Sequence, residues 1–392
     1  MDRIRTTHTG SLPRPGGLAE QLAAFDAGSL DRGERAALAA RVSGAVTRIV
    51  ARQAGIGIDL VSDGEMSKFS YTTYVKQRVT GFEGATEPLT LSEFADFPGI
   101  AAQGTLTVPN PSCTGPVAFR GGEAVAADVA NLKSALQATP GVEGFMNAAS
   151  PGIITDYFRN EYYRDDEEYL WALAEAMKPE YDLIAGSGLV LQIDCPDLAL
   201  GRHFAPKPLD VPAFRARISQ RVEALNHALR DIPPKRLRMH VCWGNYASPH
   251  HHDIPLVEII DIVLRARPAA LLVEAANPRH AHEWRVFQEV PLPPGKVLVP
   301  GVIDTLTQYI EHPRVVADRI LRYADTVGPE NVIAGADCGF ATSADSTPVD
   351  PDIAWAKLRA LSEGAEIASS ELWSTHARSG VTFSDREEQQ QC

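Results

Sequence analysis

The chain has 392 residues, and its 44% hydrophobic and 22% charged content is that of an ordinary folded protein with enough apolar material for a large core. Lys and Arg total 37 against 50 for Asp and Glu, a formal net charge of −13, and this acidic balance argues against nucleic-acid binding. No apolar run approaches ~18 residues, so the sequence predicts no membrane span, and its first residues do not resemble a secretory signal.

The cysteines are an odd and sparse set for this length: Cys113, Cys195, Cys242, Cys338 and Cys392. We therefore expect no disulfide scaffold and a reducing, cytoplasmic environment. In that compartment, a cysteine close to a histidine is first a candidate metal ligand or nucleophile.

Strand-length apolar runs alternate with helical patterns along the chain. Strands are expected near residues 4, 58, 144, 189, 236, 270, 296 and 331. Helices are expected over 31–54, 166–186, 211–230, 253–267, 279–289, 311–326 and 351–369, with Asp31 and Asp253 near helix starts as N-caps. Eight strand–helix units predict an α/β protein with the (β/α)8 TIM-barrel fold. The alternative is an open doubly wound sheet, which is disfavoured because no strand is followed by G-x-G-x-x-G.

The segment 80–140 is irregular. Alternation in AAQGTLTV (101–108) and PVAFRG (116–121) predicts a hairpin, and a short helical pattern follows at 124–137. We interpret 80–140 as an insertion within a single barrel domain spanning 1–392, and 384–392 as a frayed polar tail.

Four residues at strand ends form a candidate metal site. His240 and Cys242 lie two apart in one expected strand, so both side chains point to the same side. Glu274 lies near the end of the next strand and Cys338 just beyond the last one, all at the face where barrel enzymes build their sites. One nitrogen, two sulfurs and one oxygen suit tetrahedral Zn²⁺ and disfavour Mg²⁺ or Ca²⁺. Each residue alone could be an ordinary core or surface residue, but the four together favour a metal site.

Six short motifs resemble those in the catalytic barrel of the cobalamin-independent methionine synthases. Three resemble its zinc motifs: H-V-C-W-G-N at 240–245, E-A-A-N at 274–277 and D-C-G-F at 337–340. The others are T-G-S-L-P-R at 9–14, D-G-E at 63–65 and L-Q-I-D-C-P at 191–196. The resemblance runs in order along nearly the whole chain.

The resemblance implies a (β/α)8 barrel in which zinc activates a thiol for alkyl transfer. By motif match, the zinc ligands would be His240, Cys242, Glu274 and Cys338. The residues that would hold the amino and carboxylate groups of homocysteine are Ser11, Glu65 and Asp194.

The chain departs from the family pattern at the catalytic histidine. The family has G-V-x-D-x-H after the seventh strand, whereas G-V-I-D-T-L at 301–306 has Leu306 there. His8 and His312 are candidates to supply the proton instead. The chain also has no room for the second barrel with which the full-length synthase helps bind folate. Both departures favour a donor with a better leaving group, such as methylcobalamin, a corrinoid protein or a strained epoxide.

We therefore expect a zinc-dependent transferase that alkylates a small-molecule thiol, first of all a methyltransferase acting on homocysteine or a similar thiol in methionine biosynthesis. Two alternatives stay open: an epoxide–thiol transferase of the coenzyme M type, and a non-catalytic zinc- or thiol-binding barrel. No nucleic-acid or membrane partner is expected, and the sequence leaves a homo-oligomer open.

Three consecutive histidines, His250, His251 and His252, follow the fifth expected strand. Three adjacent side chains cannot all face one ion, so we expect a solvated loop. The alternative is that one or two of them line the mouth of the pocket.

Overall fold

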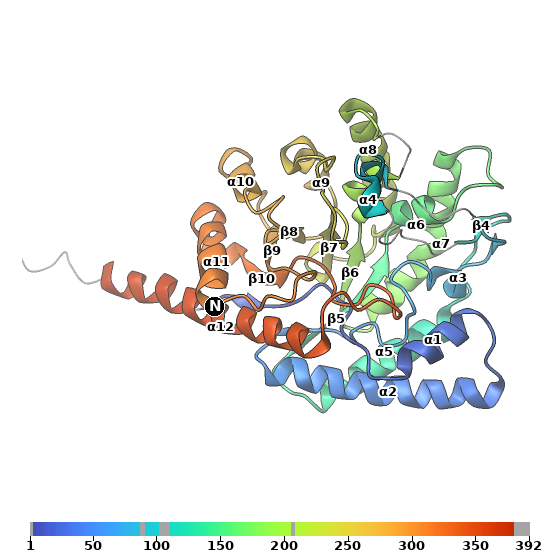
Figure 1. Ribbon diagram of the computed structural model, residues 1–392, viewed down its shortest axis with the longest axis horizontal. Coiled ribbons are helices and arrows are strands. Elements are labelled where there is room, and N and C mark those ends of the chain that lie inside the picture. Colours follow the sequence, from blue (N-terminus) through green and yellow to red (C-terminus); the bar gives the residue numbers. More distant parts are fainter. Residues whose placement is uncertain (1–2, 87–90, 102–109, 205–207, 380–392) are drawn as a thin grey trace, which may run out of the picture.

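Eight parallel strands form a nearly closed barrel in the computed structural model of the protein, which describes residues 3–86, 91–101, 110–204 and 208–379 (Figure 1). The strands are β1 (Arg5–Thr6), β2 (Leu60–Val61), β5 (Glu143–Ala149), β6 (Val190–Asp194), β7 (Leu237–Val241), β8 (Ala270–Glu274), β9 (Val297–Ile303) and β10 (Ile333–Ala336). Their hydrogen-bonded order is β1-β10-β9-β8-β7-β6-β5-β2. Across the remaining gap the Asp59 amide donates to Thr6 O at 3.2 Å. The (β/α)8 prediction is confirmed.

Side chains alternate between two cores, because successive strand residues point to opposite faces. Outside the barrel the strands pack against helices and form the main hydrophobic core. Inside it, Leu60, Phe145 and Val190 form a small separate cluster. The buried Arg238 guanidinium lies over the Phe145 ring, 4.0 Å from its centroid. Because His240 is two residues further along β7, it points to the same inner side as Arg238.

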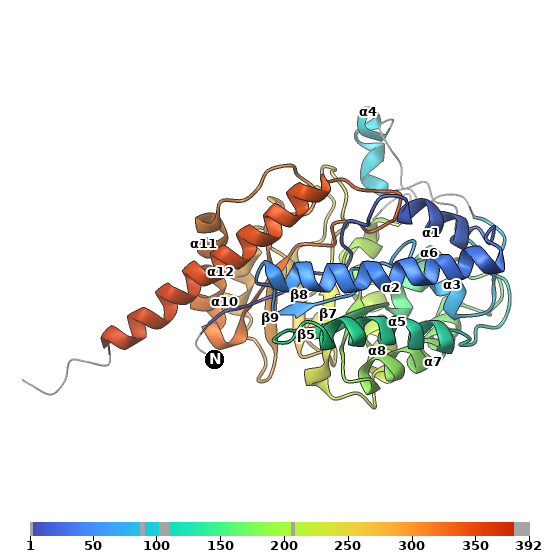
Figure 2. The same ribbon diagram turned by 90° about the horizontal axis from the view of Figure 1, so that it is seen from below.

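Long helices cover the outside of the barrel. They are α2 (Arg32–Gly55), α5 (Gly122–Gln137), α7 (Asp166–Gly186), α8 (Val211–Ala228), α11 (Pro313–Val327) and α12 (Pro351–Ser379). Figure 2 shows α2, α5 and α12 along one side, with the end of α12 extending beyond the barrel. α2 begins where predicted because Asp31 and Glu34 form a capping box, each side chain accepting from the other's backbone N–H at 2.8 Å. α7 has the predicted bounds.

Short helices and turns connect these elements. The helices are α1 (Leu18–Asp26), α3 (Val75–Arg78), α4 (Pro98–Ala101), α6 (Pro151–Tyr157), α9 (Ile260–Val263) and α10 (Val286–Glu289). The 3-10 turns are η1 (Ser92–Ala95), η2 (Pro196–Leu198), η3 (Leu200–His203), η4 (Pro234–Arg236), η5 (Leu256–Glu258), η6 (Glu283–Arg285) and η7 (Pro329–Asn331). The expected helices over 253–267 and 279–289 are therefore much shorter than predicted. None of the helices in the described ranges has the length and apolar character needed to cross a membrane.

The prediction that Asp253 caps a helix is wrong. Helix α9 begins only at Ile260, and the Asp253 carboxylate is buried, with imidazoles of His203, His250 and His280 within 3.1 Å of its oxygens. The rings of His250 and His280 hold one of its oxygens, Oδ2, in place of backbone N–H groups. The prediction of a solvated loop is also wrong for His250, which is buried. His251 and His252 are half-buried.

The irregular segment contains an antiparallel pair, but not the one predicted. The pair is formed by β3 (Phe82–Glu83) and β4 (Ser112–Cys113), while Phe119 makes only an isolated bridge to Val79. Most of AAQGTLTV lies outside the described residues, and so does the predicted polar tail 384–392. α5 lies in the last part of this segment and packs against α2 in the outer layer of the barrel. The division into one domain with an insertion remains a prediction.

Candidate metal centre and substrate cavity

The predicted metal ligands meet at the carboxyl ends of the strands. Alternation along β7 turns His240 and Cys242 to the inner side, β8 ends at Glu274, and Cys338 follows β10 by two residues. All four side chains are buried. Parallel strands end at one face of the barrel, which is why residues nearly 100 positions apart in sequence come together here.

The two cysteine sulfurs lie 3.1 Å apart, and Cys338 Sγ lies 3.9 Å from His240 Nε2. The ligand atoms of these three residues all lie within 4.8 Å of one another. A proton shared with Cys338 lowers the pKa of Cys242 well below that of a free thiol, and Cys242 in turn raises the pKa of Cys338. The Gly244 N–H also donates to Cys242 Sγ at 3.1 Å. The site thus favours one thiolate, the form of cysteine that binds metals.

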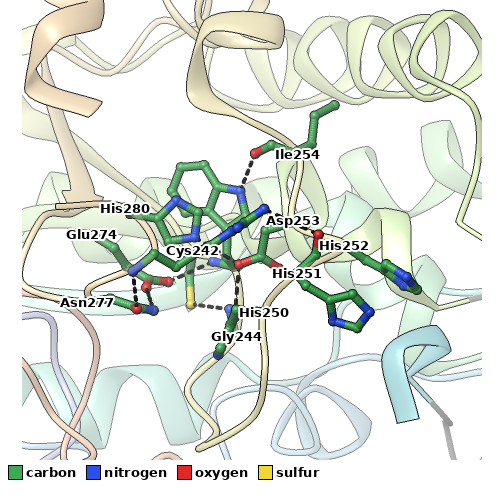
Figure 3. Close-up of polar contacts among 12 residues, drawn as sticks. Cys242, Gly244, His250, His251, His252, Asp253, Ile254, Glu274, Asn277 and His280 are labelled. Atoms are coloured by element: carbon green, nitrogen blue, oxygen red, sulfur yellow. Dashed lines mark hydrogen bonds and ion pairs between the residues drawn. The ribbon is translucent and has the colours of Figure 1, made fainter. Parts of the chain in front are cut away.

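Glu274 lies close to Cys242, as Figure 3 shows, and both of its oxygens are hydrogen-bonded. Oε1 accepts from the Trp243 N–H at 2.8 Å and lies 4.0 Å from Cys338 Sγ, and Oε2 accepts from Asn277 Nδ2 at 2.9 Å. Burial, aided by the charge of Cys242, raises the pKa of Glu274 to about 8. The structure therefore brings three predicted ligands together and holds Glu274 at their edge.

The His240 ring is held between two strands. Its Nε2 lies 3.1 Å from the Asp337 carbonyl oxygen and its Nδ1 lies 3.7 Å from Asp194 Oδ1. Burial opposes protonation, but Asp194 and Cys242 outweigh it and raise the pKa of His240 to about 10. A carboxylate behind a ligating imidazole is the usual device that fixes the orientation of the ring.

Asp337 braces the site, a role that the sequence reasoning missed. Its Oδ1 accepts from the backbone N–H groups of Ala275 and Ala276 at 2.8 and 2.9 Å, and its Oδ2 accepts from Asn277 N at 2.6 Å. Gly301 leaves the space for this carboxylate, because a Cβ there would collide with Asp337 Oδ1. The available signal was the position of Asp337 directly before Cys338, at the end of a strand.

A cavity at the mouth of the barrel adjoins the cluster. Its lining combines three of the predicted metal ligands with all the predicted substrate residues: His240, Cys242, Cys338, Ser11, Glu65 and Asp194. Residues that are up to 327 positions apart in the sequence therefore line one cavity.

The two cavity carboxylates differ in their environments. Asp194 accepts from Gln192 Nε2 at 2.7 Å and from Asn147 Nδ2 at 3.0 Å. Glu65 has a φ of 57°, a left-handed conformation that is uncommon for a non-glycine residue and often marks a functional site. Its buried Oε2 has no hydrogen-bond partner, and burial raises the pKa of Glu65 to about 7. Asn147, a further lining residue, was missed because an asparagine in a strand carries no chemical signature of its own.

The two proposed replacement acids lie away from the cavity. His8 is buried, its Nε2 lies 2.7 Å from Gln53 Oε1, and burial lowers its pKa to about 3. Such an imidazole is neutral and cannot serve as a proton donor at neutral pH. His312 is the N-cap residue of α11, where its Nδ1 accepts from Arg314 N at 3.1 Å. Neither histidine, nor Leu306, lines the cavity.

A (β/α)8 barrel with a buried sulfur, imidazole and carboxylate cluster at the carboxyl ends of its strands belongs to the class of barrel enzymes with a candidate transition-metal site. The family model described as "Cobalamin-independent synthase, Catalytic domain" matches residues 4–350. The chain therefore belongs to the cobalamin-independent methionine synthase family, and it is an enzyme of the methyltransferase type.

Similar proteins agree with this assignment. The methionine synthases of Saccharolobus solfataricus and Thermococcus kodakarensis are 25% and 27% identical to the chain, over 94% and 97% of its length and 96% of theirs. The B12-independent methionine synthase of Shewanella sp. W3-18-1, solved with selenomethionine, has a TM-score of 0.75 at 20% identity and covers 95% of this chain and 99% of its own. A putative counterpart from Listeria monocytogenes has a TM-score of 0.64 at 18% identity, with the same coverages. These two structures support the fold.

Replacing both cysteines of the cluster should remove metal without unfolding the barrel. We expect the Cys242→Ser/Cys338→Ser variant to bind about one zinc fewer per chain than the wild type, because hydroxyls are poor zinc ligands. Metal analysis after purification without added zinc measures this difference. Cys113→Ser, a change at a buried cysteine outside the cavity, is the matched control and should keep the wild-type zinc content. Wild-type zinc in the double variant would overturn the ligand assignment.

Proposed function

We propose that the protein is a zinc-dependent methyltransferase that methylates the thiol of homocysteine. The observation that carries this proposal is the single cavity that joins the sulfur–imidazole cluster to two carboxylates, Glu65 and Asp194. Family membership and the relatives named methionine synthase support the same activity.

The ligand atoms of the candidate metal centre suit zinc better than Mg²⁺ or Ca²⁺. Two sulfurs and an imidazole favour zinc over Mg²⁺ or Ca²⁺, and the pKa of Cys242 is already lowered in favour of the thiolate. The residues that would hold the ion are His240, Cys242, Cys338 and Glu274. When bound, zinc lowers the pKa of a coordinated thiol, so that its sulfur is nucleophilic at neutral pH. Because Glu274 lies at the edge of the set and has other hydrogen-bond partners, we expect it to be the ligand that yields to an incoming sulfur.

Two cavity carboxylates suit the ammonium group of an amino acid. Asp194 is fixed by Gln192 and Asn147, and Glu65 has a buried oxygen without a partner. Ser11, next to the Cys338 segment through a 2.9 Å bond from Phe340 N to Ser11 O, offers a hydroxyl to the substrate carboxylate. Charged partners held inside a pocket discriminate strongly against thiols that lack the amino group.

The transfer itself requires alignment and a dry cavity. The substrate sulfur attacks the methyl carbon, the bond from that carbon to its donor breaks with its electrons, and the product is a thioether. Tyr71 and Tyr157 line the same cavity with their hydroxyls 3.1 Å apart, and Leu200 adds an apolar wall. These side chains exclude water and thereby favour a charged nucleophile reacting with a methyl donor.

The donor is inferred from the histidines that line the cavity. Methyl-folate leaves as a basic amine that needs a proton, and a positioned acid typically accelerates such a step ~10²–10⁴-fold. Among the described residues that line the cavity, His240 is the sole imidazole, and it belongs to the metal cluster. A methyl–cobalt bond needs no protonation of its leaving group, so we propose a methylcobalamin-type donor.

Glu65 should make binding of the product methionine depend on pH. Its pKa of about 7 means that its carboxylate forms as the pH rises from 6 to 8, while the methionine ammonium stays charged. Affinity for methionine should therefore rise over this range, and Glu65→Gln should weaken binding ~10–100-fold at pH 8. Isothermal titration calorimetry measures both effects, and the thioether introduces no thiol proton of its own.

The pH profile of the variant is the control for that experiment. Glu65→Gln removes the titrating group while keeping the side-chain volume, so its affinity should be flat between pH 6 and 8. An unchanged pH profile in Glu65→Gln would show that another group recognises the ammonium.

The donor preference can be measured side by side. With homocysteine as acceptor and saturating donors, methylcobalamin should react at least about tenfold faster than methyltetrahydrofolate. The reason is that only the folate leaving group needs a proton from a general acid. His312→Gln, which removes an imidazole outside the cavity, is the matched control and should leave both rates nearly unchanged. Efficient turnover of methyl-folate by the wild type would contradict the donor assignment.

A further inference from the structure

A second cluster of acidic and imidazole side chains lies beyond the wall of the cavity. Glu93 comes from η1, His203 ends η3, and Asp253 lies in the connection after β7. The exposed fractions of these residues are 0%, 0% and 5%. One oxygen or nitrogen from each lies within 4.8 Å of the other two. None of these residues belongs to the sulfur cluster or lines the main cavity.

The buried ligand atoms of this cluster lack hydrogen-bond partners. This is so for Glu93 Oε2, for both ring nitrogens of His203 and for Asp253 Oδ1. His203 Nε2 and Asp253 Oδ1 approach to 3.1 Å, but not in the geometry of a hydrogen bond. Burying polar atoms without partners destabilises the folded state, and folded proteins rarely accept several such atoms in one place. An ion bonded to these atoms would remove that cost.

The opposite oxygens of both carboxylates are already held by other residues. Ser248 Oγ donates to Glu93 Oε1. Asp253 Oδ2 lies 2.9 Å from His250 Nδ1 and 2.8 Å from His280 Nε2, as Figure 3 shows for these three residues. Metal-binding carboxylates are commonly oriented in this way, with one oxygen hydrogen-bonded and the other directed at the ion. Glu283 in turn holds the His280 ring, because its Oε2 lies 2.9 Å from His280 Nδ1.

We propose that Glu93, His203 and Asp253 form a second metal site, which binds a first-row divalent transition-metal ion such as Zn²⁺. Two carboxylate oxygens and one imidazole nitrogen are a ligand set that Zn²⁺ and Mn²⁺ accept, and their combined charge neutralises a dication. The set contains no sulfur, which distinguishes it chemically from the cysteine cluster. The proposal does not depend on the methyltransferase assignment.

The second ion would tie three segments together at the cavity wall. Leu200, which lines the cavity, is in the same turn as His203 and packs with Leu91 and Phe94 near Glu93. Tyr246, another lining residue, stacks on the His250 ring with centroids 4.6 Å apart. Binding would therefore fix the cavity wall, a positioning role rather than a chemical one.

The test uses the Cys242→Ser/Cys338→Ser variant, from which the sulfur site is removed. After treatment with chelator and dialysis against Zn²⁺, it should still bind about one zinc per chain. Adding His203→Gln or Glu93→Gln should weaken that binding at least ~10-fold. The matched control is His252→Gln, because His252 lies in the same segment with its Nε2 2.8 Å from Asp96, outside the proposed set.

Two further measurements keep the test decisive if a variant folds poorly. Co²⁺ bound to the double cysteine variant should give ligand-field absorption without sulfur charge-transfer bands. Chelator-treated wild type should take up about two zinc ions per chain, against about one for His203→Gln alone. The proposal is overturned if the double cysteine variant binds no metal, if His203→Gln has no effect, or if His252→Gln removes the ion instead.

Discussion

The buried carboxylate of Asp337 holds the end of β10 to the end of β8, and the geometry of the candidate metal centre depends on it. Its oxygens accept three consecutive backbone N–H groups, from Ala275 to Asn277, directly after Glu274. Its own carbonyl oxygen lies 3.1 Å from the His240 ring, and the next residue is Cys338. The collision of a Cβ at Gly301 with this carboxylate explains why a glycine is needed on the strand between them. One anion thus sets the relative positions of an imidazole, a sulfur and a carboxylate.

Asp337 can hold these strand ends together because its side chain is buried. Polar atoms buried there must find partners, so the side chains are locked before any ligand arrives. Asp194 shows the consequence, since it is held by two amides on one side and faces His240 on the other. Glu65 combines a buried oxygen that has no hydrogen-bond partner with a left-handed backbone, and such unsatisfied positions are where a substrate group is expected.

The sequence predicted what depends on short-range patterns. Two-residue alternation put His240 and Cys242 on one side, and strand–helix counting placed Glu274 and Cys338 at the same face, so the candidate centre followed from the order of the strands. The predictions that failed concern side chains whose partners lie far away in the sequence. Asp253 has the spacing of an N-cap, but histidines from three different segments compete for its carboxylate. The roles of Asp337 and Asn147 were missed for the same reason, because their partners are distant in sequence.

We propose that the substrate thiol binds directly to a zinc ion held by His240, Cys242 and Cys338. X-ray absorption at the zinc edge, with and without homocysteine, tests it most directly. We expect zinc to gain one sulfur neighbour at ~2.3 Å and lose an oxygen neighbour when homocysteine is added, with no such gain in the Cys242→Ser/Cys338→Ser variant. A zinc shell that stays unchanged at homocysteine concentrations that support turnover would contradict it.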